Sequence, residues 1–205
     1  MSSKAVAEAV AAIRAGKPVV LPFDTVYGLA AEPYHDASAR RLYRLKGREA
    51  TQPTALVASS VDELLECLPE LRGRAALLVR ALLPGPLTLV VPNPARRYRW
   101  VTGTNPETLG VRVPDLDGPA AEVLDRVGAV IATSANHPGG PDPHRVEEVP
   151  ADIRAGAAAV VDGGELPGTP STVIDLTAPE PRVLREGALP ADDALRRLGA
   201  AVRSS

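Results

Sequence analysis

Polar and cationic side chains follow several apolar stretches of this sequence. The stretch VVLPFDT ends in Asp24 and Thr25, and VIATSAN runs into Ser134 and Asn136. In α/β proteins, ligands bind in the crevice at the ends of the strands. Hydroxyl, carboxylate and amide groups gathered at one such place would suit a nucleotide or a carboxylate ligand. An ordinary strand-ending turn is the simpler explanation of each stretch taken singly.

Cationic side chains occur at related positions. Arg112 lies in the apolar stretch LGVRVP and Arg185 in RVLREG, whereas Lys46 and Arg48 close a predicted helix. An unpaired buried guanidinium is very unfavourable, so Arg112 needs an anionic partner, either a ligand or nearby Asp115. Lys46 and Arg48 either face an anion or simply face water at a helix C-terminus.

Familiar catalytic and metal motifs are missing from the sequence. It contains no G-x-x-x-x-G-K-[ST] loop, no G-x-G-x-x-G after a strand, and no arrangement that suggests a Ser-His-Asp triad. The single cysteine, Cys67, excludes a disulfide framework and a cysteine zinc site, and we expect a buried packing thiol. His35, His137 and His144 show no metal-ligand spacing and are expected to be solvated. A bound nucleotide would therefore be held by side chains and scattered backbone amides.

Composition limits the class of protein. The 205 residues include 45% hydrophobic residues, which suffices for one domain with a large core. Aromatic residues make up only 3% and the net charge is −2, which argues against stacking of single-stranded bases as the main activity. The sequence lacks an apolar stretch of the ~20 residues that a membrane span needs. We expect a soluble cytoplasmic protein without membrane association.

Strand-like and helix-like stretches alternate along the chain. The patterns predict strands at 17–21, 54–58, 86–92, 108–114, 128–135, 158–164, 171–176 and 182–187. They predict helices at about 2–15, 36–48, 61–71, 74–83, 119–127, 146–156 and 190–202. Continuous apolar strands indicate a sheet covered by helices on both faces, and the short link after residue 176 indicates an antiparallel hairpin. The prediction is one α/β domain over residues 1–205, with a twisted, open, mixed sheet.

Seven blocks of the sequence resemble, in order, those of the YrdC family. They are LPFDTVYGLAAE, LKGR followed by QP, PGPLTLVV, VRVPD, TSANHPGG, STVIDL and LREG, and they extend over residues 18–187. The best-defined members are threonylcarbamoyl-AMP synthases, and this chain resembles their short, single-domain form. The resemblance implies a sheet with a large, positively lined cavity.

The resemblance also implies a reaction. L-threonine, bicarbonate and ATP would give threonylcarbamoyl-AMP and pyrophosphate, and a separate transferase would use the product to form threonylcarbamoyladenosine in tRNA. Mg²⁺ is expected with ATP, although no block identifies its ligands.

Family blocks assign roles to residues of this chain. The catalytic positions would be Lys46, Arg48, Ser134 and Asn136, which would also contact ATP. Further ATP contacts would be Gln52, Thr108, Asp142 and Arg185. Threonine would be held by Thr25, Arg112, Ala132 and Ser171.

Two departures from the family blocks leave alternatives open. Phe23 stands where the family has threonine, so the amino-acid specificity is open, and a carbamoyl-transfer relative acting on another acceptor is an alternative. Asp142 stands where a small hydroxyl residue is common. A third reading is a module that binds tRNA or double-stranded RNA, with Arg96, Arg97 and Arg99 of the stretch PARRYRW as contacts.

Overall fold

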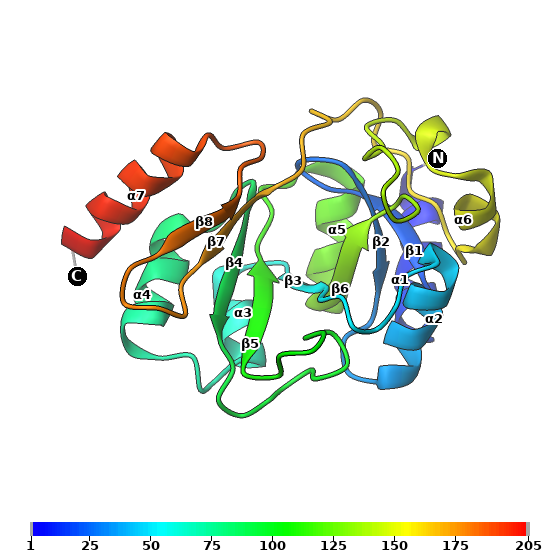
Figure 1. Ribbon diagram of the computed structural model, residues 1–205. Coiled ribbons are helices and arrows are strands. Elements are labelled where there is room, and N and C mark those ends of the chain that lie inside the picture. The colour runs from blue at the N-terminus through cyan, green and yellow to red at the C-terminus, as the bar shows by residue number, and fades with distance from the viewer. Residues whose placement is uncertain (1, 204–205) are drawn as a thin grey trace.

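A single eight-stranded mixed sheet forms the centre of the protein, whose computed structural model describes residues 2–203 (Figure 1). The strand order is β1-β2-β6-β3-β5-β4-β7-β8. The strands are β1 (Val19–Pro22), β2 (Tyr27–Ala31), β3 (Ala55–Ala58), β4 (Leu87–Pro92), β5 (Thr108–Arg112), β6 (Ala129–Ser134), β7 (Thr172–Asp175) and β8 (Arg182–Arg185). The β3–β5 and β4–β7 pairs are parallel and the other pairs are antiparallel.

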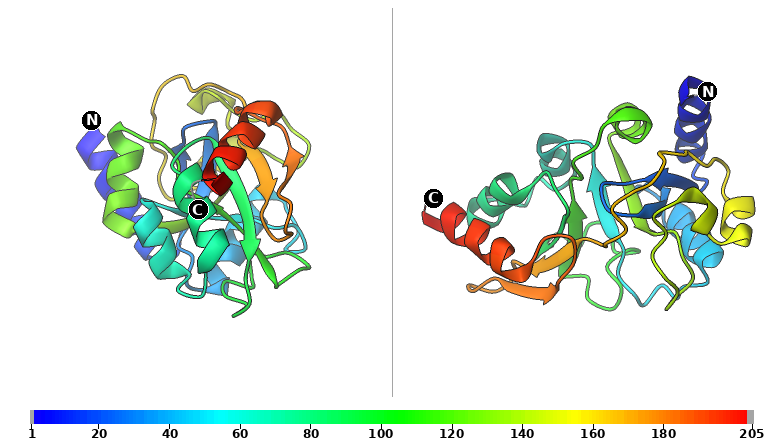
Figure 2. Two further views of the ribbon diagram at one scale, coloured as in Figure 1. Left: turned by 90° about the vertical axis from the view of Figure 1, so that its left-hand side faces the viewer. Right: turned by 90° about the horizontal axis from the view of Figure 1, so that it is seen from above.

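Helices pack around this sheet in groups (Figure 2). They are α1 (Ser2–Arg14), α2 (Asp36–Lys46), α3 (Val61–Cys67), α4 (Gly73–Leu82), α5 (Gly118–Val127), α6 (Ala151–Gly156) and α7 (Ala191–Arg203), with a 3₁₀ turn η1 at Val146–Glu148. Helix α1 lies beside α5, α7 lies beside α4, and α6 contacts α2. The described ends of the chain lie at opposite sides of the molecule.

One face of the sheet carries the main hydrophobic core. Because side chains alternate between faces, paired residues share a face. The pairings join one fully buried row across six strands: Ala31, Ile131, Leu56, Val111, Leu89 and Ile174. Apolar residues of α2, α3, α4 and α7 belong to the same cluster. This row binds the two halves of the sheet together.

Helices cover only one part of the opposite face of the sheet, which we call the divided face. Over β1, β2 and β6, helices α1 and α5 bury residues such as Ile13 and Leu124 against Leu21 and Val130. The same face continues toward β5 with small residues. Its paired positions there are Gly28 and Ser134, Ala132 and Ala55, and Gly110 and Val90. Small side chains leave room above the sheet at this place.

The predicted fold class is confirmed, but three segments differ from the prediction. Residues 158–164 form only an isolated bridge at Val160, because the chain then turns at Asp162. The helix predicted at 146–156 is divided into η1 and α6 at Pro150, which lacks the N–H that a continuous helix needs. Strand β2 was not anticipated, since its sequence YGLAA is too rich in small residues to read as a strand.

No helix among residues 2–203 combines the length and apolar character needed to span a bilayer.

We predict that Leu89→Ala lowers the free energy of unfolding by about 2–5 kcal/mol, because Leu89 is fully buried in the central row. Urea denaturation would measure the change. Leu77→Ala on α4 serves as the matched control, since Leu77 is 48% exposed. Its expected effect is below about 0.5 kcal/mol. Equal losses in the two variants would contradict this account of the core.

Candidate functional site

A cavity of about 620 Å³ lies on the divided face of the sheet, above Gly28, Ala55 and Gly110. All twelve residues to which the family blocks assign roles line it: Thr25, Lys46, Arg48, Gln52, Thr108, Arg112, Ala132, Ser134, Asn136, Asp142, Ser171 and Arg185. They come from segments scattered between residues 25 and 185 of the chain. The register and the strand order, rather than closeness in sequence, bring them together.

A buried ammonium group organises one end of the cavity. Lys46, the last residue of α2, is only 4% exposed. Its Nζ donates to the Ser134 carbonyl at 2.5 Å, to the Asn136 carbonyl at 2.9 Å and to Asn136 Oδ1 at 2.8 Å. Ser134 Oγ also donates to Asn136 Oδ1, at 2.7 Å. The ammonium therefore holds the turn after β6 in a fixed shape.

Burial changes the acidity of this ammonium. Removal from water, together with the nearby charge of Arg48, lowers the pKa of Lys46 to about 8, and Asp142 opposes this shift. An anionic ligand in the cavity would favour the charged form and raise the pKa again.

Arg48 lies next to this cluster. Its NH1 donates to Thr133 Oγ1 at 2.9 Å and its NH2 donates to the Pro53 carbonyl at 2.6 Å. The Nε atom of Arg48 is buried and has no hydrogen-bond partner in the structure. Burial also lowers the pKa of the guanidinium. A group so placed can still bind an anion.

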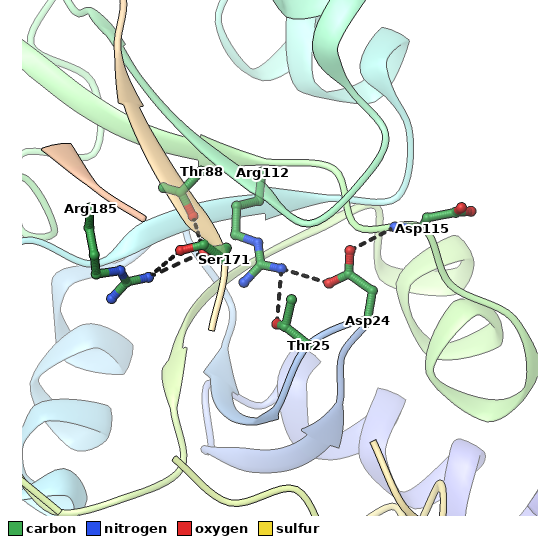
Figure 3. Close-up of polar contacts among 7 residues, drawn as sticks. All are labelled: Asp24, Thr25, Thr88, Arg112, Asp115, Ser171 and Arg185. Carbon is green, nitrogen blue, oxygen red and sulfur yellow. Dashed lines mark hydrogen bonds and ion pairs between the residues drawn. The ribbon is translucent and has the colours of Figure 1, made fainter. Parts of the chain in front are cut away.

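The other end of the cavity is built around Arg112 (Figure 3). Its NH2 donates to Asp24 Oδ1 at 2.6 Å and lies 3.4 Å from Thr25 Oγ1. Asp24 Oδ2 accepts the backbone N–H of Asp115 at 3.2 Å. Asp115 was one of two partners suggested for Arg112, beside a ligand, and this alternative was wrong, because the hairpin turn after β1 places the Asp24 carboxylate there instead. The guanidinium keeps a buried Nε without a partner.

Hydroxyl groups from the far half of the sheet complete this end. Ser171 Oγ and Thr88 Oγ1 are 2.8 Å apart, and Arg185 NH2 donates to the Ser171 carbonyl at 2.6 Å (Figure 3). Thr88 was missed by sequence reasoning. It is the single polar residue of the apolar stretch LTLVV, and its alternation with buried leucines was the available signal.

Phe23 is the one aromatic residue lining the cavity in the described part of the chain. Its ring lies against Gly28, where an added Cβ would come within 2.4 Å of the ring, and its centroid is 6.0 Å from the Arg112 guanidinium carbon. The glycine of the hairpin is thus required by close packing. The ring forms an apolar wall beside a cation.

Solvated histidines and a buried Cys67 were predicted, and the structure confirms the prediction for Cys67 and His35. His35 is exposed and contacts Glu32, whereas His144 is partly buried and contacts Glu148. His137 is half-exposed but also lines the cavity, which sequence reasoning did not anticipate, and its Nε2 lies 3.1 Å from Asp152. Cys67 is a buried packing residue.

Two of the three arginines proposed for RNA contact are engaged locally. Arg96 forms an ion pair with Glu107, and Arg97 forms two hydrogen bonds with Glu70. Their charges are balanced by neighbouring carboxylates, so RNA binding stays a prediction without structural support from these two residues.

Comparison with known proteins finds similar sequences over most of this chain. A family model for Sua5, YciO and YrdC proteins, described as "Telomere recombination", matches residues 11–187. The threonylcarbamoyl-AMP synthase of Pyrococcus abyssi is 36% identical over 190 residues, which cover 91% of this chain and 55% of that protein. This chain therefore spans about half the length of that relative.

Solved structures agree with the fold. The crystal structure of P. abyssi Sua5 complexed with L-threonine superposes with a TM-score of 0.87 at 34% identity, covering 97% of this chain and 58% of the other. Escherichia coli YciO superposes with a TM-score of 0.77 at 26% identity, covering 92% of this chain and 91% of that one. With the family model matching most of its length, this chain belongs to the Sua5/YciO/YrdC family.

Proposed function

We propose that this protein is an L-threonylcarbamoyladenylate synthase, which makes threonylcarbamoyl-AMP and pyrophosphate from L-threonine, bicarbonate and ATP. The proposal is supported by relatives that bear the name threonylcarbamoyl-AMP synthase and by the L-threonine complex of P. abyssi Sua5. One observation of this chain carries it. A cationic end suited to phosphates and a guanidinium end suited to a carboxylate share one cavity.

The chemistry requires two anions to meet. The threonine nitrogen attacks the bicarbonate carbon and, with loss of water, forms a carbamate. A carbamate oxygen then attacks the α-phosphorus of ATP, the bond from this phosphorus to the bridging oxygen breaks, and pyrophosphate leaves. Charge builds on the phosphate oxygens and on the leaving group, so fixed donors and cations are the main requirement.

The residues at the cationic end of the cavity have different roles in this reaction. In the structure Lys46 donates to three oxygens of Ser134 and Asn136, so its role is to hold these two residues as well as to supply charge. Arg48 lines the cavity, is only partly buried and uses one N–H of each terminal nitrogen for protein contacts, so it is the better candidate for direct contact with the phosphates. Gln52, Thr108 and Asp142 would contact the nucleotide from the surrounding walls.

At the other end, Arg112 would bind the threonine carboxylate through its planar fork. Asp24 holds the guanidinium from behind, and Thr25 and Ser171 offer hydroxyls to the polar groups of the amino acid. Ala132 lies between the two ends and leaves space for the carbamate. Arg185, bonded to Ser171, adds positive charge near the reacting groups.

Mg²⁺ would accompany ATP. Among the described residues no cluster of three or more metal-ligating side chains exists, and Asp142 is the one carboxylate in the cavity lining. This set fits Mg²⁺, which usually binds one or two carboxylates together with substrate phosphates and water. Asp142 would then hold the ion, which would neutralise charge on the triphosphate.

The product, a reactive mixed anhydride, would pass to a separate threonylcarbamoyl transferase that acts on tRNA. Water must be kept from the carbamate and from the anhydride because both hydrolyse.

We predict that Arg48→Ala and Arg112→Ala each lower threonine-dependent pyrophosphate release by about 10²-fold or more, because each removes a fixed cation from the reacting anions. Arg48→Ala should act mainly through ATP, and Arg112→Ala should raise the KM for threonine. Arg40→Ala is the matched control, since Arg40 pairs with Asp36 on the surface of α2. Full activity in both cavity variants, with folding verified by circular dichroism, would refute the assignment.

We predict that the cavity prefers L-threonine to L-serine and glycine, because the apolar Phe23 ring beside Arg112 offers a contact to a β-methyl group. Calorimetric titration with the three amino acids, with and without ATP, would measure the preference. One methyl group is worth about tenfold or more in such a pocket. Equal affinities would favour the carbamoyl-transfer alternative with another acceptor.

We predict that ATP binding takes up protons near pH 8. The pKa of free Lys46 is lowered to about 8, and the triphosphate favours the ammonium, so ATP binds the protonated form better. ATP affinity should therefore be full below pH 8 and fall as the pH rises above it.

Titration calorimetry in two buffers of different ionisation enthalpy would measure this uptake. Lys46→Met should bind ATP more weakly and show no pH dependence near pH 8. An affinity in the wild type that is constant from pH 7 to 9 would contradict the prediction.

A further inference from the structure

A short segment joins two distant strands across the cavity side of the sheet. The Val161 N–H donates to the Val20 carbonyl of β1, and Thr172 begins β7. In the strand order β1 is first and β7 is seventh, so the chain between Val161 and Thr172 crosses most of the width of the sheet. We name residues 162–170 of this crossing the strap (Figure 1).

Tyr27 anchors the beginning of the strap. The side chain is fully buried and does not line the cavity. Its hydroxyl lies 2.8 Å from the Gly164 carbonyl and 3.0 Å from Asp162 Oδ1, and it accepts the Gly163 N–H at 3.0 Å. Burial raises the pKa of Tyr27 to about 12, so the hydroxyl keeps its proton. Three neighbouring residues of the strap thus converge on one oxygen atom.

The contact is also tight. A Cβ added at Gly163 would come within 2.6 Å of the Pro22 ring, so only glycine lets the strap approach β1 this closely. Asp162 Oδ1 additionally accepts the Gly164 N–H at 2.9 Å, which closes the turn around the hydroxyl.

The far part of the strap reaches the amino-acid end of the cavity. The Gly168 N–H donates to the Thr25 carbonyl at 2.9 Å, and the Pro170 carbonyl accepts the Ala188 N–H at 2.8 Å. Ser171 follows directly and lines the cavity. The strap therefore ties the hairpin turn that carries Thr25 to the strand that carries Ser171.

We propose that Tyr27 is a positioning residue: through the strap its hydroxyl fixes the separation of Thr25 and Ser171, and with it the fit of the amino acid. This inference rests on the proposed function for the identity of that ligand. The strap also contacts the segment after Asp142, through the Leu166 N–H to the His144 carbonyl and through the Arg145–Glu165 ion pair. The hydrogen bonds that hold Lys46 and Arg48 at the phosphate end nevertheless involve no strap residue, so this end depends less on the strap.

Tyr27→Phe is the direct test, because it keeps the ring in the core and removes only the hydroxyl. We expect the KM for threonine to rise about tenfold, whereas the KM for ATP changes less than threefold. Amide hydrogen exchange at Gly163, Gly164 and Gly168 should accelerate. Tyr98→Phe is the matched control, since this partly buried tyrosine lies far along the chain from the strap and outside the cavity lining.

A second variant separates the effect of strap length from that of any loss of stability. Insertion of two glycines between Glu165 and Leu166 lengthens the strap while the Tyr27 contacts remain. It should raise the KM for threonine selectively, as Tyr27→Phe does. Equal rises in both KM values, or unchanged exchange in Tyr27→Phe, would overturn the proposal. Hydrogen exchange needs no activity, so a failure of the proposed function, seen as an inactive wild type, is recognised separately.

Discussion

The site depends on a buried ammonium that must find oxygen partners. Lys46 is carried into the interior at the end of α2, and an unpaired charge there would be very unfavourable. The turn after β6 supplies two carbonyls and an amide oxygen. These hydrogen bonds fix Ser134 and Asn136 relative to the end of α2. Arg48, two residues after Lys46, is thereby held at the same end of the cavity. The network exists before any ligand binds, which is what electrostatic preorganisation requires.

A second constraint is the uneven covering of the sheet. The apolar row on one face holds all central strands together, so the other face is free to carry small and polar side chains. Helices α1 and α5 cover only part of it. Gly28, Ala55 and Gly110 then form a floor that larger side chains would fill. Stability and function are thus separated between the two faces of one sheet.

The charges in the cavity repel one another in the absence of a ligand. Four cations line the cavity, Lys46, Arg48, Arg112 and Arg185, whereas Asp142 is the one carboxylate of the lining in the part of the chain that the structure describes. Asp24 pairs with Arg112 from outside the lining. Burial lowers the pKa of both Lys46 and Arg48, and for Lys46 the neighbouring charge of Arg48 lowers it further. Anionic substrates relieve this repulsion, so the same feature that strains the free protein favours binding of ATP and of a carboxylate.

The sequence by itself determined the alternation of strands and helices and the residue types of the site, because apolar periodicity and polar residues at strand ends are local signals. It did not determine that Arg112 pairs with Asp24 rather than Asp115, that YGLAA forms a strand inside the sheet, or that Thr88 lines the cavity. Those outcomes depend on register and strand order, which set contacts between residues far apart in the chain. Only the tertiary structure decided them, since the contacts made by a hairpin turn or by the strap are set once the strands that each one joins are in place.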